Sequence, residues 1–110
     1  MKQREIWYAD LNPAKGREQA GYKPVVIVSG NVLNKYFDIV IACPLTTKIK
    51  HYKGNLVLQP SEQNGLAQPS EILVFHIRSL SKNRLVKKLG TITQNQLNEI
   101  KQGLDDILKY

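Results

Sequence analysis

The chain has little cysteine and no long apolar run, and each absence narrows the class of protein. Cys43 is the one cysteine in 110 residues, so no disulfide can form within the chain, as is usual in a reducing cytosol. The longest apolar runs, residues 24–28 and 39–45, are far shorter than the roughly 20 residues that span a bilayer. The charged first residues, MKQREIWYADLNP, contain no apolar core of signal-peptide length. A soluble cytoplasmic protein with no membrane contact is therefore expected.

Residue patterns that hold metal ions or nucleotides are missing as well. His51 and His76 lie far apart in the sequence, and no carboxylates cluster beside either of them. A glycine-rich phosphate loop with the Walker spacing is absent. Cys43 lies in an apolar segment, where a buried inert thiol is more common than a nucleophile. The sequence thus predicts no metal site and no cofactor.

Basic residues, in contrast, are in excess. Sixteen Lys and Arg stand against nine Asp and Glu, which gives a formal net charge of +7 at pH 7. Hydrophobic residues make up 42% and charged residues 23%, a globular composition, and the length fits one domain over residues 1–110. The charge predicts an anionic partner, with nucleic acid the leading candidate. A solubilising basic surface is the alternative.

Apolar periodicity predicts several short strands followed by one helix. Strands are expected at residues 6–11, 25–29, 39–43, 55–58, 71–80 and 86–92. Thr93 and Gln96 have the spacing of a capping box at a helix start. Apolar residues then recur at helical spacing: Leu97, Ile100, Leu104, Ile107 and Leu108. A mainly β fold follows, in which a small, strongly curved barrel with a C-terminal amphipathic helix would remove exposed sheet edges.

A charged loop bracketed by glycines precedes the second expected strand, in the sequence GREQAGYKPVVIVS. Gly16 and Gly21 permit backbone angles that side chains disfavour, and Pro24 fixes one φ angle just after the loop. A tight turn would therefore hold several polar side chains together on a rigid base. These side chains are Arg17, Glu18 and Lys23. An ordinary solvated turn is the alternative.

A second polar loop, TTKIKHYK at residues 46–53, holds three lysines, a histidine and a tyrosine. Cations for phosphates and an aromatic ring for base stacking are what single-stranded RNA recognition requires, although a solvated loop would look similar. RNA also carries its own nucleophile, the 2′-hydroxyl. A metal-free nuclease then needs a base, a cation for the phosphorane and a proton source. The residues suited to these tasks are Glu18, Lys23 and Thr46, with Arg17 or Arg78 holding phosphate.

Three motifs in chain order carry a resemblance to a known family. The first joins IWxxDLNP at residues 6–13 to GxEQxGxKPVV at residues 16–26. The second is PLTT at residues 44–47, and the third is IRSLSKxR at residues 77–84, followed by KLG at residues 88–90. In this order and spacing the chain closely resembles the MazF/PemK family of toxin endoribonucleases. The resemblance runs from about Arg4 to the terminal helix.

The resemblance implies a small SH3-like barrel with added helices, usually assembled as a homodimer. It also implies metal-free cleavage of single-stranded RNA, commonly mRNA, that leaves a 2′,3′-cyclic phosphate and a 5′-hydroxyl. A cognate antitoxin with an acidic, flexible tail would block the RNA groove. The catalytic centre implied by the motifs comprises Glu18, Lys23 and Thr46. The residues expected to contact RNA are Arg17, Gln19, Thr47, Lys48, Lys50, His51, Lys53, His76 and Arg78.

Two positions depart from the family pattern. Lys23 stands where arginine is most common, and lysine lacks the planar fork that holds two phosphate oxygens at once. Either Lys23 suffices as a point charge, or Arg17 supplies the missing guanidinium. His76 stands where many relatives carry glutamine, and it either contacts RNA or fills a surface position. Two other functions therefore stay open: a non-catalytic toxin that binds DNA gyrase, and an RNA binder that has lost catalysis.

Overall fold

Seven antiparallel strands and two α-helices make up the fold, which a computed structural model describes for residues 1–12 and 21–109. The strands are β1 (Glu5–Asp10), β2 (Tyr22–Ile27), β3 (Ile39–Thr46), β4 (Leu56–Leu58), β5 (Ser70–Ile72), β6 (Arg78–Ser81) and β7 (Leu85–Thr91). The helices are α1 (Asn31–Tyr36) and α2 (Gln94–Lys109), with short 3-10 helices η1 (Val74–His76) and η2 (Lys82–Arg84). No helix in this described part is both long and apolar enough to cross a membrane.

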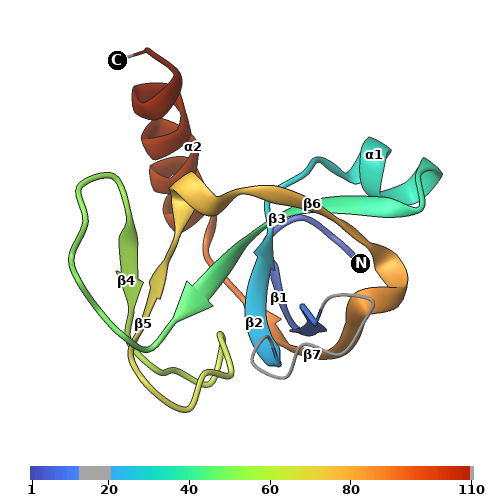
Figure 1. The fold of residues 1–110 in the computed structure, drawn as a ribbon, viewed down its shortest axis with the longest axis horizontal. Coiled ribbons are helices and arrows are strands. Elements are labelled where there is room, and N and C mark those ends of the chain that lie inside the picture. Colours follow the sequence, from blue (N-terminus) through green and yellow to red (C-terminus); the bar gives the residue numbers. More distant parts are fainter. Residues whose placement is uncertain (13–20, 110) are drawn as a thin grey trace.

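The strands form one sheet that curls into a half-barrel. Their order is β4-β5-β3-β2-β1-β7, with β6 also paired to β3 (Figure 1). The long β3 makes the curl possible because it changes partner along its length. Its first half pairs with β6 and its last two residues pair with β5. A mainly β, strongly curved sheet with a C-terminal helix was expected, and this prediction is confirmed.

Helix α2 begins where the capping box predicted it and covers the larger core. The Thr93 N–H donates to Oε1 of Gln96 at 2.8 Å, and the Gln96 N–H donates to Oγ1 of Thr93 at 3.1 Å. Leu97 and Ile100 are fully buried against the sheet. The last turn extends beyond the sheet, so that Leu108 is 86% exposed (Figure 1). The predicted apolar stripe therefore packs through Leu97, Ile100 and the partly buried Leu104, whereas Ile107 and Leu108 are exposed.

Two predicted strands end in the wrong place. Residues 71–80 form β5, η1 and β6 rather than one strand, because β5 pairs with the end of β3 and β6 with its beginning. The 3-10 helix η1 between β5 and β6 lets the chain pass from the end of β3 to its beginning. Val74 of η1 is buried in the core. Strand β3 also continues through Pro44, which pairs with Val25 of β2 and accepts a hydrogen bond from the Leu73 N–H at its carbonyl.

Strand β2 begins earlier than predicted and includes a residue assigned to the preceding loop. Lys23 pairs with Ala9 of β1, and Tyr22 pairs with Asp10. Pairing with β1 thus extends the strand to the N-terminal side of Pro24. The short helix α1 had no counterpart in the predicted elements. It is stabilised by the buried Asn34, whose side-chain amide donates to the carbonyl of Ser29 at 2.9 Å.

Candidate active site

Two cavities meet at Lys23, whose side chain is exposed on β2. The first has a volume of about 420 Å³ and lies between β2 and the end of β3. It is lined by Tyr8, Tyr22, Lys23, Pro24, Leu45, Thr46, Thr47, Lys48 and Ser70. The second has a volume of about 280 Å³ and is lined by Leu11, Lys23, Pro44, Leu73, His76 and Arg78. Among the predicted site residues, Lys23 therefore shares one cavity with Thr46 and another with His76.

Thr46 is the last residue of β3 and presents its hydroxyl beside the first cavity. Its Oγ1 accepts a hydrogen bond from the backbone N–H of Lys48 at 3.1 Å. Because the oxygen is used as an acceptor, the O–H hydrogen can be donated to a ligand in the cavity. Lys23 and Thr46 thus offer a cation and a hydroxyl donor to one bound group.

A pair of tyrosines at the rim of the first cavity was not predicted from the sequence. The rings of Tyr8 and Tyr22 stack with centroids 5.7 Å apart and planes inclined by 18°. Both rings are partly exposed, Tyr22 by 50%. The two residues sit on neighbouring strands β1 and β2, so their meeting depends on strand register rather than on sequence spacing. Exposed stacked rings beside a cation are suited to a nucleobase.

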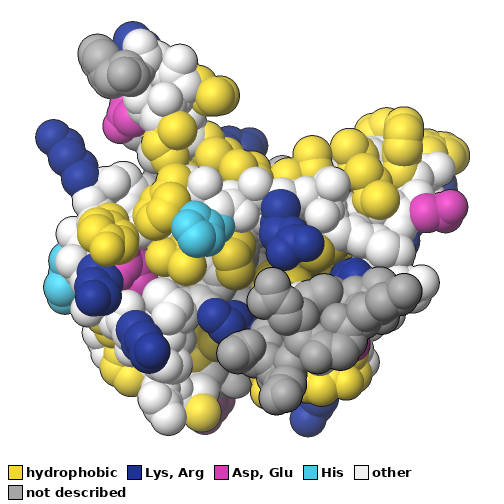
Figure 2. All heavy atoms as spheres, viewed as in Figure 1, with side chains coloured by type: hydrophobic (Ala, Val, Ile, Leu, Met, Phe, Trp, Pro, Cys, Tyr) yellow, Lys and Arg dark blue, Asp and Glu magenta, His cyan; other side chains and the backbone are white. Residues whose placement is uncertain are grey.

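The segment between β3 and β4, residues 47–55, carries most of the predicted cations, and we call it the basic loop. The side chains of Lys48, Lys50, His51 and Lys53 are all exposed. Of these, Lys48 lines the first cavity, whereas Lys53 lines a separate cavity against α2. Figure 2 shows one face of the molecule, on which Lys, Arg and His side chains are spread over the region below α2. Neither of the cavities at Lys23 is lined by Lys50 or His51.

A buried carboxylate, Glu71 on β5, lies beneath the basic loop and was not predicted as a site residue. Its Oε1 accepts the backbone N–H groups of Lys50 at 2.7 Å and His51 at 2.9 Å. Its Oε2 accepts the N–H of Tyr52 at 3.0 Å and the side-chain amide of Asn55 at 2.9 Å. The only sequence signal was a lone carboxylate at the start of the predicted strand 71–80.

Hydrogen bonding keeps Glu71 ionised despite its burial. Burial alone would raise the pKa of this carboxyl group, but the hydrogen bonds from Asn55 and from the loop N–H groups outweigh it and lower the pKa from 4.5 to about 2. A carboxyl group whose pKa is lower in the folded state than in the unfolded state stabilises the folded protein when the pH is above the unfolded-state pKa. The contribution is therefore complete above about pH 4.5 and is lost as the pH falls towards 2.

Aromatic side chains connect the basic loop with η1. The rings of Tyr52 and Phe75 meet edge to face with centroids 5.7 Å apart. The rings of Phe75 and His76 also meet edge to face, with centroids 4.5 Å apart. His76 lines the second cavity together with Arg78 of β6. The loop and the second cavity are thus joined by packed rings.

The predicted residues Arg17, Glu18 and Gln19 lie outside the described residues, as does Gly16. The two ends of their loop are described. Gly21 has φ of 59°, in the region that favours glycine, and its N–H donates to Oδ1 of Asn12 at 2.6 Å. Arg84 donates from Nη1 to the carbonyls of Asp10 and Asn12, at 3.0 and 2.6 Å. This arginine of the third motif therefore fixes the chain at the start of the loop.

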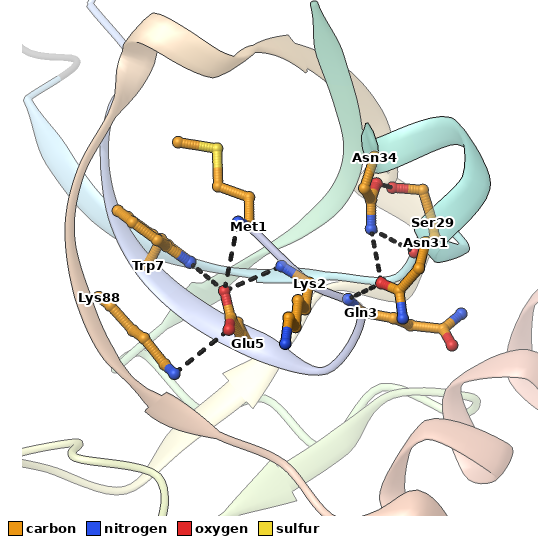
Figure 3. Close-up of polar contacts among 9 residues, drawn as sticks. All are labelled: Met1, Lys2, Gln3, Glu5, Trp7, Ser29, Asn31, Asn34 and Lys88. Atoms are coloured by element: carbon orange, nitrogen blue, oxygen red, sulfur yellow. Dashed lines mark hydrogen bonds and ion pairs between the residues drawn. The ribbon is translucent and has the colours of Figure 1, made fainter. Parts of the chain in front are cut away.

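A second buried carboxylate, Glu5 on β1, forms a separate network (Figure 3). Its Oε1 accepts hydrogen bonds from the Lys2 N–H and from Nε1 of Trp7, both at 2.9 Å. Its Oε2 lies 3.2 Å from Nζ of Lys88. Burial raises the pKa of Glu5, but these hydrogen bonds and the lysine charge together lower it. Neither cavity at Lys23 is lined by Glu5, so this network is structural.

Other nucleophiles and metal ligands are not assembled in the described part of the chain. Burial raises the pKa of the Cys43 thiol to about 12, so this thiol is protonated and unreactive at neutral pH. Within residues 1–12 and 21–109, no group of three or more His, Cys, Asp or Glu is placed to hold a metal ion.

Comparisons with known proteins agree with the fold. Residues 2–108 match the model of the PemK-like, MazF-like toxins of type II toxin–antitoxin systems. The chain is 35% identical over 107 residues to an endoribonuclease MazF of Staphylococcus saprophyticus, covering 96% of this chain and 88% of the relative. A MazF of Staphylococcus epidermidis is 33% identical over 106 residues, with the same coverage of both chains.

Solved structures with the same architecture include toxins bound to antitoxins. An endoribonuclease from a mycobacterial species, in complex with its cognate antitoxin, matches with a TM-score of 0.81 and 27% identity over 99% of this chain and 95% of that chain. A MazE–MazF complex from Deinococcus radiodurans matches with a TM-score of 0.84 and 25% identity, over 99% and 96%. The fold and these matches thus place the chain in a class of small half-barrel toxins. By its sequence the chain belongs to the PemK-like, MazF-like toxin family.

Proposed function

We propose that the protein is a metal-independent endoribonuclease that cleaves single-stranded RNA, including mRNA, as the toxin of a type II toxin–antitoxin system. The observation that carries this proposal is the cavity in which Lys23 and Thr46 lie together with Lys48 of the basic loop. Membership of the toxin family, and relatives named as endoribonucleases, support the same activity. Its substrate places the protein in the cytoplasm.

The proposed reaction uses the 2′-hydroxyl of the substrate. Glu18 removes the proton, the 2′-oxygen forms a bond to phosphorus, and the bond from phosphorus to the 5′-oxygen breaks. The leaving 5′-oxygen takes up a proton from water, so the products are a 2′,3′-cyclic phosphate and a 5′-hydroxyl. Lys23 offsets the negative charge that grows on the phosphorane, and the hydroxyl of Thr46 donates to one of its oxygens. No step needs a metal ion.

The proposed partners follow from the same surface. RNA would extend from the two cavities over the basic loop, with Arg17, Gln19, Thr47 and Arg78 as further contacts. A cognate antitoxin with an acidic tail would cover this surface, since its carboxylates would compete with phosphates for the same cations. We also propose that the toxin acts as a homodimer, like other members of its family.

The decisive test is incubation of the purified protein with a long single-stranded RNA in excess EDTA. The proposal expects discrete cleavage products with a 5′-hydroxyl end, because the chemistry needs no metal. RNA that is bound but stays intact would instead identify a binder that has lost catalysis. Inhibition of DNA gyrase with neither RNA binding nor cleavage would identify a toxin that acts by binding protein.

RNA binding through the basic loop is expected to be strongly salt-dependent. Each phosphate contact in single-stranded nucleic acid contributes about −0.7 to the slope of log K against log salt. Replacing Lys48 and Lys50 by alanine should therefore weaken binding and reduce the slope by about 1.4. A matched control replaces Lys35 of α1 and Lys101 of α2, which removes the same charge elsewhere. Equal slopes for the two double variants, measured by fluorescence anisotropy, would exclude the loop from the RNA path.

A further inference from the structure

Glu71 accepts hydrogen bonds from four residues of the basic loop, namely Lys50, His51, Tyr52 and Asn55. Its carboxylate is fully buried, so it does not itself meet a ligand on the surface. Three successive backbone N–H groups, those of Lys50, His51 and Tyr52, all donate to it. These N–H groups converge because His51 adopts φ of 55°, a left-handed conformation that is unfavourable for a side chain larger than glycine. The carboxylate therefore stabilises a loop shape that the backbone alone disfavours.

Asn55 extends this arrangement to η1 and the second cavity. Its side-chain Nδ2 donates to Oε2 of Glu71 at 2.9 Å, and its Oδ1 accepts the backbone N–H of Val74 at 3.0 Å. Val74 begins η1, whose Phe75 receives the ring of Tyr52. One buried carboxylate thus fixes the backbone at Lys50, His51 and Tyr52 and, through Asn55, the start of η1.

Glu71 also lies next to the proposed catalytic threonine, but without touching its hydroxyl. The two residues are partners in the β3–β5 ladder, where the backbone of Thr46 faces that of Glu71. This backbone pairing does not depend on the Glu71 side chain. A change of the carboxylate should therefore alter the loop and leave the positions of Lys23 and Thr46 in place.

We propose that Glu71 is a positioning residue for RNA binding, which holds the basic loop in the one shape that its lysines and Tyr52 need to contact RNA. The proposal rests on the proposed function, because it assigns the loop to the substrate of that reaction. In the part of the chain that the structure describes, no ion pair joins Lys48, Lys50 or Lys53 to a carboxylate. Glu71 is held by N–H groups instead, which leaves these cations for phosphate.

The test variant is Glu71→Gln, which keeps the size of the side chain. Its amide group turns one acceptor oxygen into a donor that faces two N–H donors, so the loop loses part of its support. If the loop then holds its binding shape only one-tenth of the time, the apparent Kd rises about tenfold, because Kd scales inversely with the competent fraction. KM for RNA should rise by a similar factor, while kcat at saturating RNA stays within about twofold.

Glu5→Gln is the matched control. Glu5 is also a buried carboxylate that accepts a backbone N–H, a side-chain N–H and a lysine, but it supports β1 and β7 (Figure 3). Its loss should lower the thermal midpoint and leave Kd and KM for RNA unchanged. If the effect on KM came from a general loss of stability, KM would rise in both variants. If Glu71 positions the basic loop, KM rises only in Glu71→Gln.

The experiment measures Kd, kcat, KM and amide exchange rates at a temperature well below each variant's unfolding midpoint. Fluorescence anisotropy with a fully 2′-O-methylated RNA gives Kd without cleavage, and a cleavable RNA gives kcat and KM. Hydrogen exchange should speed up at the amides of Lys50, His51 and Tyr52 in Glu71→Gln, with β1 and β2 unchanged. Should this variant fail to fold, Asn55→Ala removes one of the four hydrogen bonds to Glu71 together with the bond from the Val74 N–H. If the loop then holds its binding shape about one-third of the time, Kd should rise about threefold.

Each outcome decides the proposal. A rise in Kd and KM with faster exchange in the loop supports it. Faster exchange in the loop with unchanged Kd and KM overturns the positioning role of Glu71. A fall in kcat at unchanged KM also overturns it. In both cases, RNA cleavage by the wild-type protein leaves the proposed function standing. Wild-type protein that binds RNA but does not cleave it overturns the proposed function alone. Wild-type protein that does not bind RNA overturns both.

Discussion

Replacing Lys23 by alanine is expected to lower the rate of RNA cleavage by about 10²–10³, the usual effect of removing one preorganised group that offsets transition-state charge. Lys23 projects from β2, where pairing with Ala9 of β1 fixes its backbone, and its exposed side chain lines both cavities. The phosphorane carries more negative charge than the bound phosphate, and the cation therefore matters most in the transition state. RNA binding should fall much less, because the cations of the basic loop remain.

Single-turnover cleavage of one RNA separates these effects. Lys23→Arg should retain or raise the rate, since a guanidinium can hold two phosphate oxygens together. Lys87→Ala, at another exposed lysine of the sheet on β7, serves as the control and should cut at the parental rate. Circular dichroism confirms that each variant is folded. Cleavage by Lys23→Ala at the parental rate would remove this residue from the catalytic centre.

Local signals in the sequence were enough for the elements that depend on neighbouring residues. The capping box at Thr93 and Gln96 fixed the start of α2, because both of its hydrogen bonds join residues three apart. The apolar runs of β2 and β3 identified two central strands in the same way. The mainly β class followed from these elements together, and the motifs pointed to the correct family.

Local signals in the sequence could not predict which distant strands pair with one another. Residues 71–80 look like one long strand of mixed polarity because no glycine or proline interrupts them, yet β5 and β6 pair with opposite ends of β3. Pro44 looks like a strand end, yet it continues β3 because β2 offers it a partner at Val25. Each of these errors concerns pairing across more than 15 residues, which no local pattern reports.

In the candidate site too, the sequence predicted some residues, whereas others could be found only from the pairing of distant strands. Lys23 and Thr46 belong to separate motifs and meet because β2 and β3 pair in register, with Val25 opposite Pro44. The sequence supplied both residues through the family motifs. It did not supply Glu71, because a lone acidic residue in a strand of mixed polarity has no distinguishing spacing. Its role appears only when the basic loop is seen to fold over it.

Thr46→Val is expected to lower cleavage by a factor comparable to that for Lys23→Ala, about 10²–10³. Valine keeps the branched shape of threonine, so the end of β3 and its pairing with Glu71 should persist. The lost hydrogen bond is the one from the exposed Lys48 N–H, which water can replace, so stability should change by no more than about 1 kcal/mol. The fall in rate would then report the missing donor to the phosphorane.

Two further variants test whether the hydroxyl itself is responsible. Thr46→Ser restores a hydroxyl on a smaller side chain and should recover most of the activity. Thr91→Val makes the same replacement on β7, at a position that lines neither cavity at Lys23, and should leave cleavage unchanged. The measurement is single-turnover cleavage under saturating protein, so that differences in RNA affinity do not enter. If Thr46→Val and Thr46→Ser lose the same activity, packing at the end of β3 matters rather than the hydroxyl, and Thr46 is not a catalytic residue.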